Sequence, residues 1–206
     1  MAKAGPRRST ASAEELRREL LDATVRVLAR DGFAHASARA IAAEAGTVNG
    51  SIYYHFGSMD GLLGATVQDL ADRGIARISA GVGGDGAVHE WPDRLGAVLR
   101  AEVASDDGRA MLELLVGART SEALADDVRA AVDRAIDYAT EQLAAVLGDA
   151  PVVQVVPVEL MAELAGATFL GIEVLAQNGR ELDVDRLVAV VAVLVGIVTG
   201  IAPPPP

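Results

Sequence analysis

The segment 37–63 constrains the fold most, because it contains two short amphipathic helices separated only by Gly46 and Thr47. Ser37 is predicted to cap the first helix and Thr47 the second, since their hydroxyl oxygens accept backbone N–H groups at helix starts. Gly46 is predicted to end the first helix. The expected inward-facing residues are Ile41, Ala42 and Ala45, then Val48, Ile52 and Phe56. Such a tight glycine turn makes the helices cross steeply, as in a helix-turn-helix.

Longer helices are predicted on both sides of this pair. Ser12 is expected to cap a helix that Asp31 and Gly32 end. Its apolar residues recur at helical spacing and are Leu16, Leu20, Ala23, Val27 and Leu28. Ser58 is predicted to cap a fourth helix that runs to about Ile78.

The rest of the chain is also predicted to be helical, after a glycine-rich break at 81–86. Further helices are expected at 92–104, 108–119, 121–147, 157–177 and 183–201, and only 152–156 has a competing strand pattern. The predicted fold class is therefore all-α, with an N-terminal three-helix domain and a larger C-terminal helical domain. The expected parts are a flexible basic arm at 1–12, a helix-turn-helix domain at 13–60, a C-terminal domain at 61–202 and a proline tail at 203–206.

Charge is distributed unevenly along the chain. The net charge is -11, but residues 1–60 hold 8 Lys and Arg against 7 Asp and Glu, whereas residues 61–206 hold 10 against 22. Because phosphate neutralisation needs local Lys or Arg, only the first segment is suited to approach DNA. Lys3, Arg7 and Arg8 in the arm fit a disordered terminus and a DNA-contacting arm equally well.

Several functional classes find no support in the sequence. The absence of cysteine excludes disulfides, thiolate zinc sites and cysteine nucleophiles. His35, His55 and His89 lack metal-ligand spacing, and no phosphate-binding glycine loop follows a strand, so neither an enzyme nor a cofactor is expected. The N-terminus has no apolar signal segment, and the most apolar run is shorter than the roughly 20 residues of a membrane span. We therefore expect a cytoplasmic protein.

The exposed face of the second short helix is the predicted DNA-binding surface. Gly50 permits a close approach of the helix backbone to the base edges, and Asn49 and Ser51 can form hydrogen bonds with those edges. The hydroxyl groups and the histidine ring nearby can donate hydrogen bonds to phosphate oxygens. The predicted DNA-binding residues are Ser37, Arg39, Thr47, Asn49, Gly50, Ser51, Tyr53, Tyr54 and His55. The alternatives are a simple cap at Ser37, core packing for Tyr53, and a solvated surface at Tyr54 and His55.

The order and spacing of these residues resemble the DNA-binding domain of the TetR family of bacterial repressors. The matching stretches are Ile41–Gly46, Gly50–Phe56 with its Tyr-Tyr-His-Phe run, and Ser58–Leu63. The resemblance covers about residues 13–70 and includes the family's contact positions. It implies a homodimer that binds pseudo-palindromic, double-stranded operator DNA and is released by a small-molecule effector in the C-terminal domain. Activation in place of repression stays open.

Met59 departs from this pattern, because the family usually has a lysine there, close to the phosphate backbone. A methionine cannot neutralise a phosphate, so operator affinity is expected to be lower unless the N-terminal arginines compensate. Met59 and the net charge of -11 support the alternative of a small-molecule-binding or scaffold protein with a weakened helix-turn-helix.

The last two predicted helices are expected to form the dimer interface. The helix at 183–201 is apolar nearly all round, so it must be buried on several sides, either by a second copy or at the centre of a monomer. The predicted interface residues are Leu164, Thr168, Gly171, Ile172, Leu187, Val191, Leu194 and Val198. The suggested effector-lining residues are Trp91, Met111, Tyr138 and Phe169, although for any single one of them ordinary core packing is the favoured interpretation.

Overall fold

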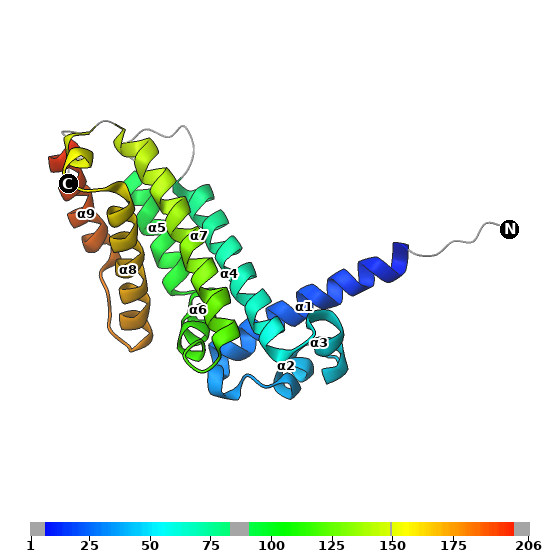
Figure 1. Cartoon of the computed structure of the whole chain (residues 1–206). Coiled ribbons are helices and arrows are strands. Elements are labelled where there is room, and N and C mark those ends of the chain that lie inside the picture. The colour runs from blue at the N-terminus through cyan, green and yellow to red at the C-terminus, as the bar shows by residue number, and fades with distance from the viewer. Residues whose placement is uncertain (1–6, 83–90, 149, 200–206) are drawn as a thin grey trace. The chain divides into compact units, whose positions relative to one another are not determined.

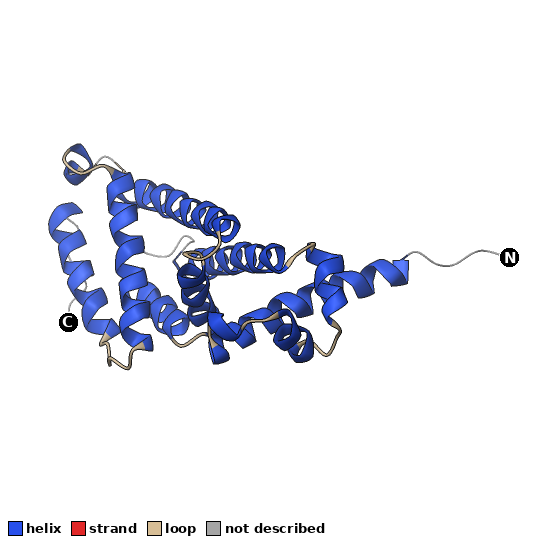
Figure 2. Ribbon diagram, turned by 60° about the horizontal axis from the view of Figure 1, so that its bottom comes forward, coloured by secondary structure: helices blue, strands red, loops and turns tan. Residues whose placement is uncertain are grey.

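The computed structural model describes residues 7–82, 91–148 and 150–199, and within these ranges every regular element is a helix (Figures 1 and 2). The elements are α1 (Arg7–Asp31), η1 (Phe33–His35), α2 (Ala38–Glu44), α3 (Asn49–Phe56), α4 (Met59–Val82), α5 (Trp91–Val103), α6 (Asp106–Gly117), α7 (Glu122–Leu147), η3 (Pro151–Gln154), α8 (Val158–Gln177) and α9 (Val184–Thr199). The predicted all-α class is confirmed. The stretch with a strand pattern at 152–156 begins instead within the 3₁₀ helix η3.

The chain forms two compact units. The first contains the described residues up to Leu70 together with Arg109–Val128, and the second contains Ala71–Gly108 together with residues from Arg129 onward. Helices α4, α6 and α7 each contribute to both units, so the division falls inside helices and not in loops. The first unit therefore includes a segment that lies far beyond residue 60 in the sequence.

The core of the first unit is built from apolar residues at helical spacing. On α1, Leu20, Ala23 and Val27 are fully buried and lie three and four residues apart, which puts them on one face. Ile41 of α2 and Ile52 of α3 are also fully buried and belong to the same cluster. Burial of these side chains fixes the positions of α2 and α3 against α1.

Helix α1 begins at Arg7, earlier than the predicted cap at Ser12. The predicted start was therefore wrong, and residues 7–12 are helical. Residues 7–31 contain no glycine or proline, so nothing in the backbone chemistry interrupts the helix there. Lys3 lies outside the described residues.

The segment 109–128 is fixed to the first unit by contacts with residues distant in sequence. The backbone N–H of Phe33 donates to Oε2 of Glu113 on α6, with a nitrogen–oxygen distance of 2.7 Å. A Cβ built on Gly117 would lie 2.1 Å from the Phe33 ring, so only glycine leaves room for that ring. Near the start of α7, the backbone carbonyl of Asp127 accepts a hydrogen bond from Gln68 of α4 at 2.9 Å.

In the second unit, α5 packs against both α8 and α9. Val184, Val188 and Ala192 are buried and follow a four-residue spacing along one face of α9. Arg77 of α4 donates two hydrogen bonds to Glu102 of α5, at 2.7 and 2.8 Å, and one to Asp107 of α6, at 2.7 Å. This arginine joins three helices within the unit.

Candidate nucleic-acid interface

The turn between α2 and α3 has the geometry expected of a glycine-terminated helix. Gly46 has φ 64°, a left-handed conformation that favours glycine. Its N–H bonds to the carbonyl of Ala43 at 3.2 Å, and the N–H of Thr47 bonds to that of Ala42 at 2.8 Å. At the other end of α2, Ser37 Oγ accepts from the N–H of Ala40 at 3.2 Å. The predicted cap and the predicted glycine stop are both confirmed.

The start of α3 differs from the prediction. Val48 is the N-cap and no side chain caps the helix, so the predicted cap at Thr47 was wrong. The Thr47 hydroxyl instead hydrogen-bonds to that of Ser51 at 2.9 Å. Val48 is 70% exposed, so its predicted inward orientation was also wrong. Because Val48 has extended dihedrals, it lies outside the helical period that buries Ile52.

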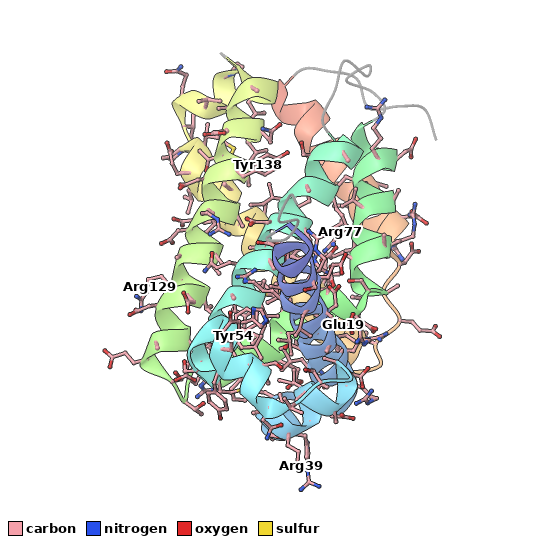
Figure 3. All side chains as sticks on the ribbon, turned by 90° about the vertical axis from the view of Figure 1, so that its right-hand side faces the viewer. Glu19, Arg39, Tyr54, Arg77, Arg129 and Tyr138 are labelled. Atoms are coloured by element: carbon pink, nitrogen blue, oxygen red, sulfur yellow. The ribbon has the colours of Figure 1, made fainter. Side chains whose placement is uncertain are left out.

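Most of the predicted DNA-binding residues lie on the surface of this helix pair. Tyr54 is 83% exposed and Tyr53 is 53% exposed, so Tyr53 is not a core residue. Arg39 points away from the ribbon (Figure 3). The exposed residues of the predicted set are Ser37, Arg39, Asn49, Gly50, Tyr53 and Tyr54, and the half-buried ones are Thr47, Ser51 and His55. The structure thus brings together a polar face on α2 and α3.

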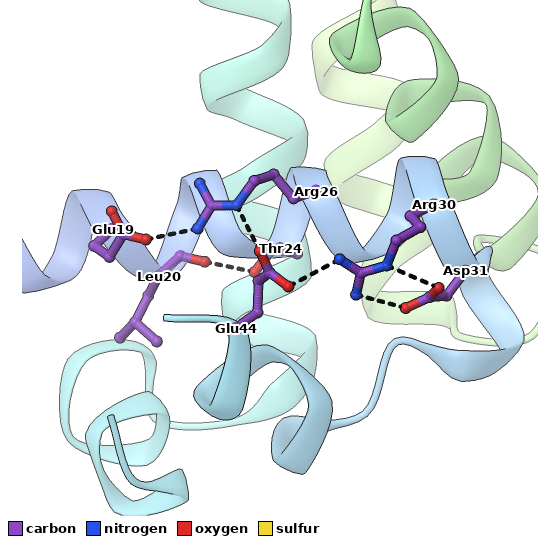
Figure 4. Close-up of polar contacts among 7 residues, drawn as sticks. All are labelled: Glu19, Leu20, Thr24, Arg26, Arg30, Asp31 and Glu44. Atoms are coloured by element: carbon purple, nitrogen blue, oxygen red, sulfur yellow. Dashed lines mark hydrogen bonds and ion pairs between the residues drawn. The ribbon is translucent and has the colours of Figure 1, made fainter. Parts of the chain in front are cut away.

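An ion-pair network joins α1 to α2 (Figure 4). Glu44 Oε1 accepts from Arg26 at 2.8 Å and its Oε2 accepts from Arg30 at 2.9 Å. Arg26 also pairs with Glu19, and Arg30 with Asp31. The hydrogen bonds from Arg26 and Arg30 hold the pKa of Glu44 below its ordinary value of 4.5. These two arginines are therefore committed to carboxylates and poorly placed to neutralise phosphate.

The aromatic side chains of α3 contact one another, and the last of them, Phe56, contacts an arginine of α1. The rings of Tyr54 and His55 meet edge to face with centroids 5.0 Å apart, and the centroids of His55 and Phe56 are 6.3 Å apart. The guanidinium carbon of Arg17 on α1 lies 5.0 Å from the Phe56 centroid. Sequence reasoning missed Arg17, because helical spacing gives its position on α1 but not which ring of another helix it meets.

Met59, the first residue of α4, contributes to packing. It is half-buried and contacts the core cluster of the first unit. The preceding Ser58 caps α4 as predicted, since its Oγ accepts from the N–H of Gly61 at 2.9 Å. The side chains that open α4 are thus apolar at Met59 and acidic at Asp60, and neither can neutralise a phosphate.

Residues 20–66, which include this helix-turn-helix, the C-terminal half of α1 and the start of α4, match the family model of the bacterial regulatory proteins, tetR family. This segment is therefore a DNA-binding domain of the tetR type. The resemblance inferred from the Tyr-Tyr-His-Phe run is thereby confirmed. The matched residues include Ser37, Arg39 and the whole of α3, so the predicted DNA-binding residues all fall inside the TetR-type domain.

Similar proteins include a nicotine-responsive transcriptional repressor, HdnoR, from Paenarthrobacter nicotinovorans. It is 29% identical over 106 residues, which cover 52% of this chain and 55% of the relative. Among solved structures, a regulator from Rhodococcus sp. assigned to the TetR family superposes with a TM-score of 0.73 and 24% identity, over 90% of this chain and 99% of that one. A transcriptional regulator from Rhodococcus sp. Rha1 gives a TM-score of 0.71 and 24% identity, over 92% and 99%. Both structures support the helical fold along most of the chain.

The residues predicted for a dimer interface lie mainly on one exposed strip of α8 and on α9. Leu164 is 59% exposed, Thr168 and Gly171 are exposed, and Ile172 is buried. On α9, Leu187 and Val191 are 40% and 41% exposed. The side chains of Leu194 and Val198 lie outside the described residues.

The suggested effector-lining residues are not gathered by any described contact. Tyr138 and Phe169 are half-buried in the second unit, whereas the half-buried Met111 belongs to the first, and the Trp91 side chain lies outside the described residues. These four residues stay a prediction. In the part of the chain that the structure describes, no helix is long and apolar enough to cross a membrane and no His, Asp and Glu cluster suits a metal ion.

Proposed function

We propose that this protein is a homodimeric, ligand-responsive transcriptional repressor that binds a pseudo-palindromic operator. The observation that carries the proposal is the exposed polar face of α2 and α3, held on a buried core within a segment that matches the tetR family. In this proposal α3 enters the major groove, where Asn49, Gly50 and Ser51 meet base edges. Arg39, Tyr54 and His55 contact phosphates.

The apolar faces of α8 and α9 support a dimer. On α8, Leu160, Leu164 and Leu175 are between 44% and 59% exposed, and they fall with Thr168 and Gly171 at spacings of three and four residues. On α9, one face is buried within the protomer while Leu187, Val190, Val191 and Val193 stay at least 40% exposed. A second copy would remove these side chains from water, and a dimer is what a two-fold operator requires.

The effector is proposed to bind in the second unit. A nicotine-responsive relative supports control by a small molecule and repression as the mode of control. Glu173 of α8 is only 2% exposed and lies against Gly108, where a Cβ would approach its Oε2 to 3.0 Å. Residues 61–206 hold 22 Asp and Glu against 10 Lys and Arg, and this negative charge disfavours an anionic molecule, so we expect a cationic or neutral effector.

Selection of duplexes from a random-sequence library by the purified protein tests this function. We expect an enriched inverted repeat whose half-sites lie about 34–36 Å apart, or a multiple of that distance. Arg39→Ala and Tyr54→Ala should weaken binding to the selected duplex in mobility-shift assays, while Arg129→Ala, which removes an exposed charge from α7, should not. Failure to enrich any duplex would favour the scaffold alternative.

A further inference from the structure

We propose that Arg17 of α1 binds a DNA phosphate beside α3, which would add α1 to the DNA interface. The inference rests on the proposed function and deepens it by assigning a phosphate contact outside α2 and α3. It concerns the part of the interface next to Phe56, where the opening residues of α4 supply no positive charge.

The position of Arg17 is the first support. Its guanidinium carbon lies 5.0 Å from the Phe56 centroid, within the roughly 6 Å range of a cation–π contact. Phe56 packs against the core but directly follows Tyr54 and His55, two of the predicted DNA-contacting residues, and its ring centroid is 6.3 Å from that of His55. The guanidinium thus has a defined place next to α3.

The distribution of charge is the second support. Arg26 and Arg30 of α1 are paired with Glu19, Glu44 and Asp31. Among the described residues no ion pair involves Arg17, which is exposed. A phosphate therefore meets no competing carboxylate on Arg17, whereas on Arg26 or Arg30 it would have to displace one.

The chemistry of a stacked guanidinium is the third support. A guanidinium presents several N–H donors in one plane and forms strong paired hydrogen bonds to phosphate oxygens. Contact with the Phe56 ring restricts the long side chain before DNA arrives. Less rotamer freedom is then lost on binding, which favours the contact.

The test compares Arg17→Ala with Arg18→Ala in the full-length protein. Arg18 is the adjacent exposed arginine, turned about 100° around the helix, so both variants lose one positive charge from α1 but from different faces of it. Affinity for the selected duplex and for a scrambled duplex is measured over a range of salt concentrations. For Arg17→Ala we expect the slope of log affinity against log salt to fall by about 0.9 per subunit, or about 1.8 for a dimer, on both duplexes. Arg17→Lys should restore most of the slope because it keeps the charge.

Equal slopes of log affinity against log salt for the two alanine variants would overturn the assignment. Weaker binding by Arg17→Ala with an unchanged slope would also overturn it, because that result indicates only a packing role. A wild type that binds the selected duplex while Arg17→Ala keeps its full slope refutes this inference alone. A wild type that selects no duplex refutes the proposed function as well.

Discussion

Substitution of Gly61 by alanine should destabilise the protein, although alanine is usually favoured over glycine inside a helix. Gly61 lies in the first turn of α4, and its N–H donates to Ser58 Oγ at 2.9 Å. A Cβ built there would be 2.2 Å from the backbone oxygen of Phe56, the last residue of α3. The clash is between the added Cβ and a backbone oxygen, so it cannot be relieved by the movement of a flexible side chain.

The expected magnitude follows from this distance. Real Cβ contacts stay above 3.0 Å, so the end of α3 and the start of α4 must separate by at least 0.8 Å. Overpacking of this kind costs about 1–3 kcal/mol. The higher helix propensity of alanine offsets about 0.5–1 kcal/mol of that. We expect Gly61→Ala to lower the free energy of unfolding by about 0.5–2 kcal/mol.

Gly74→Ala is the matched control on the same helix. A Cβ at Gly74 meets nothing within 4 Å, so only the propensity gain of about 0.5–1 kcal/mol should be seen. Urea unfolding followed by circular dichroism at 222 nm, near the usual helix minimum, measures both variants. If Gly61→Ala were as stable as Gly74→Ala, the close approach of the α3 end to α4 would not exist in solution.

Three further predictions concern the dimer, acid stability and the α6 contact. Leu164→Asp should place an unpaired carboxylate in the proposed interface and give monomers in sedimentation, whereas Val155→Asp, at an 81% exposed position of the chain, should leave dimers intact. Glu44→Gln should cost about 0.5–1 kcal/mol at neutral pH. The pKa of Glu44 in the folded protein is lowered below 4.5, so the wild type has its extra stability above pH 4.5 and loses it as the pH falls through that folded pKa. A difference in the free energy of unfolding between wild type and Glu44→Gln that acid leaves unchanged would refute the role of the ion pairs. Glu113→Leu should cost about 1–3 kcal/mol in urea unfolding by removing the acceptor for the Phe33 N–H, and Glu113→Gln, which keeps an acceptor, should recover most of it.

Local signals in the sequence determined much of the helix-turn-helix. Ser37 and Ser58 cap α2 and α4 as predicted, and Gly46 ends α2, because capping and left-handed turns depend on residues within a few positions of each other. Helical spacing likewise predicted the burial of Ile52. The same spacing failed at Val48, where the helix had not yet begun.

Only the tertiary structure decided which distant residues meet. Nothing local to Arg17 indicates the Phe56 ring, and nothing local to Glu113 indicates the N–H of Phe33, eighty positions away. The apolar pattern of α9 predicted burial on several sides, but the structure showed which face the protomer itself covers. Periodicity reports the register within one helix, whereas contacts between helices depend on how their buried faces pack together, which no single segment encodes.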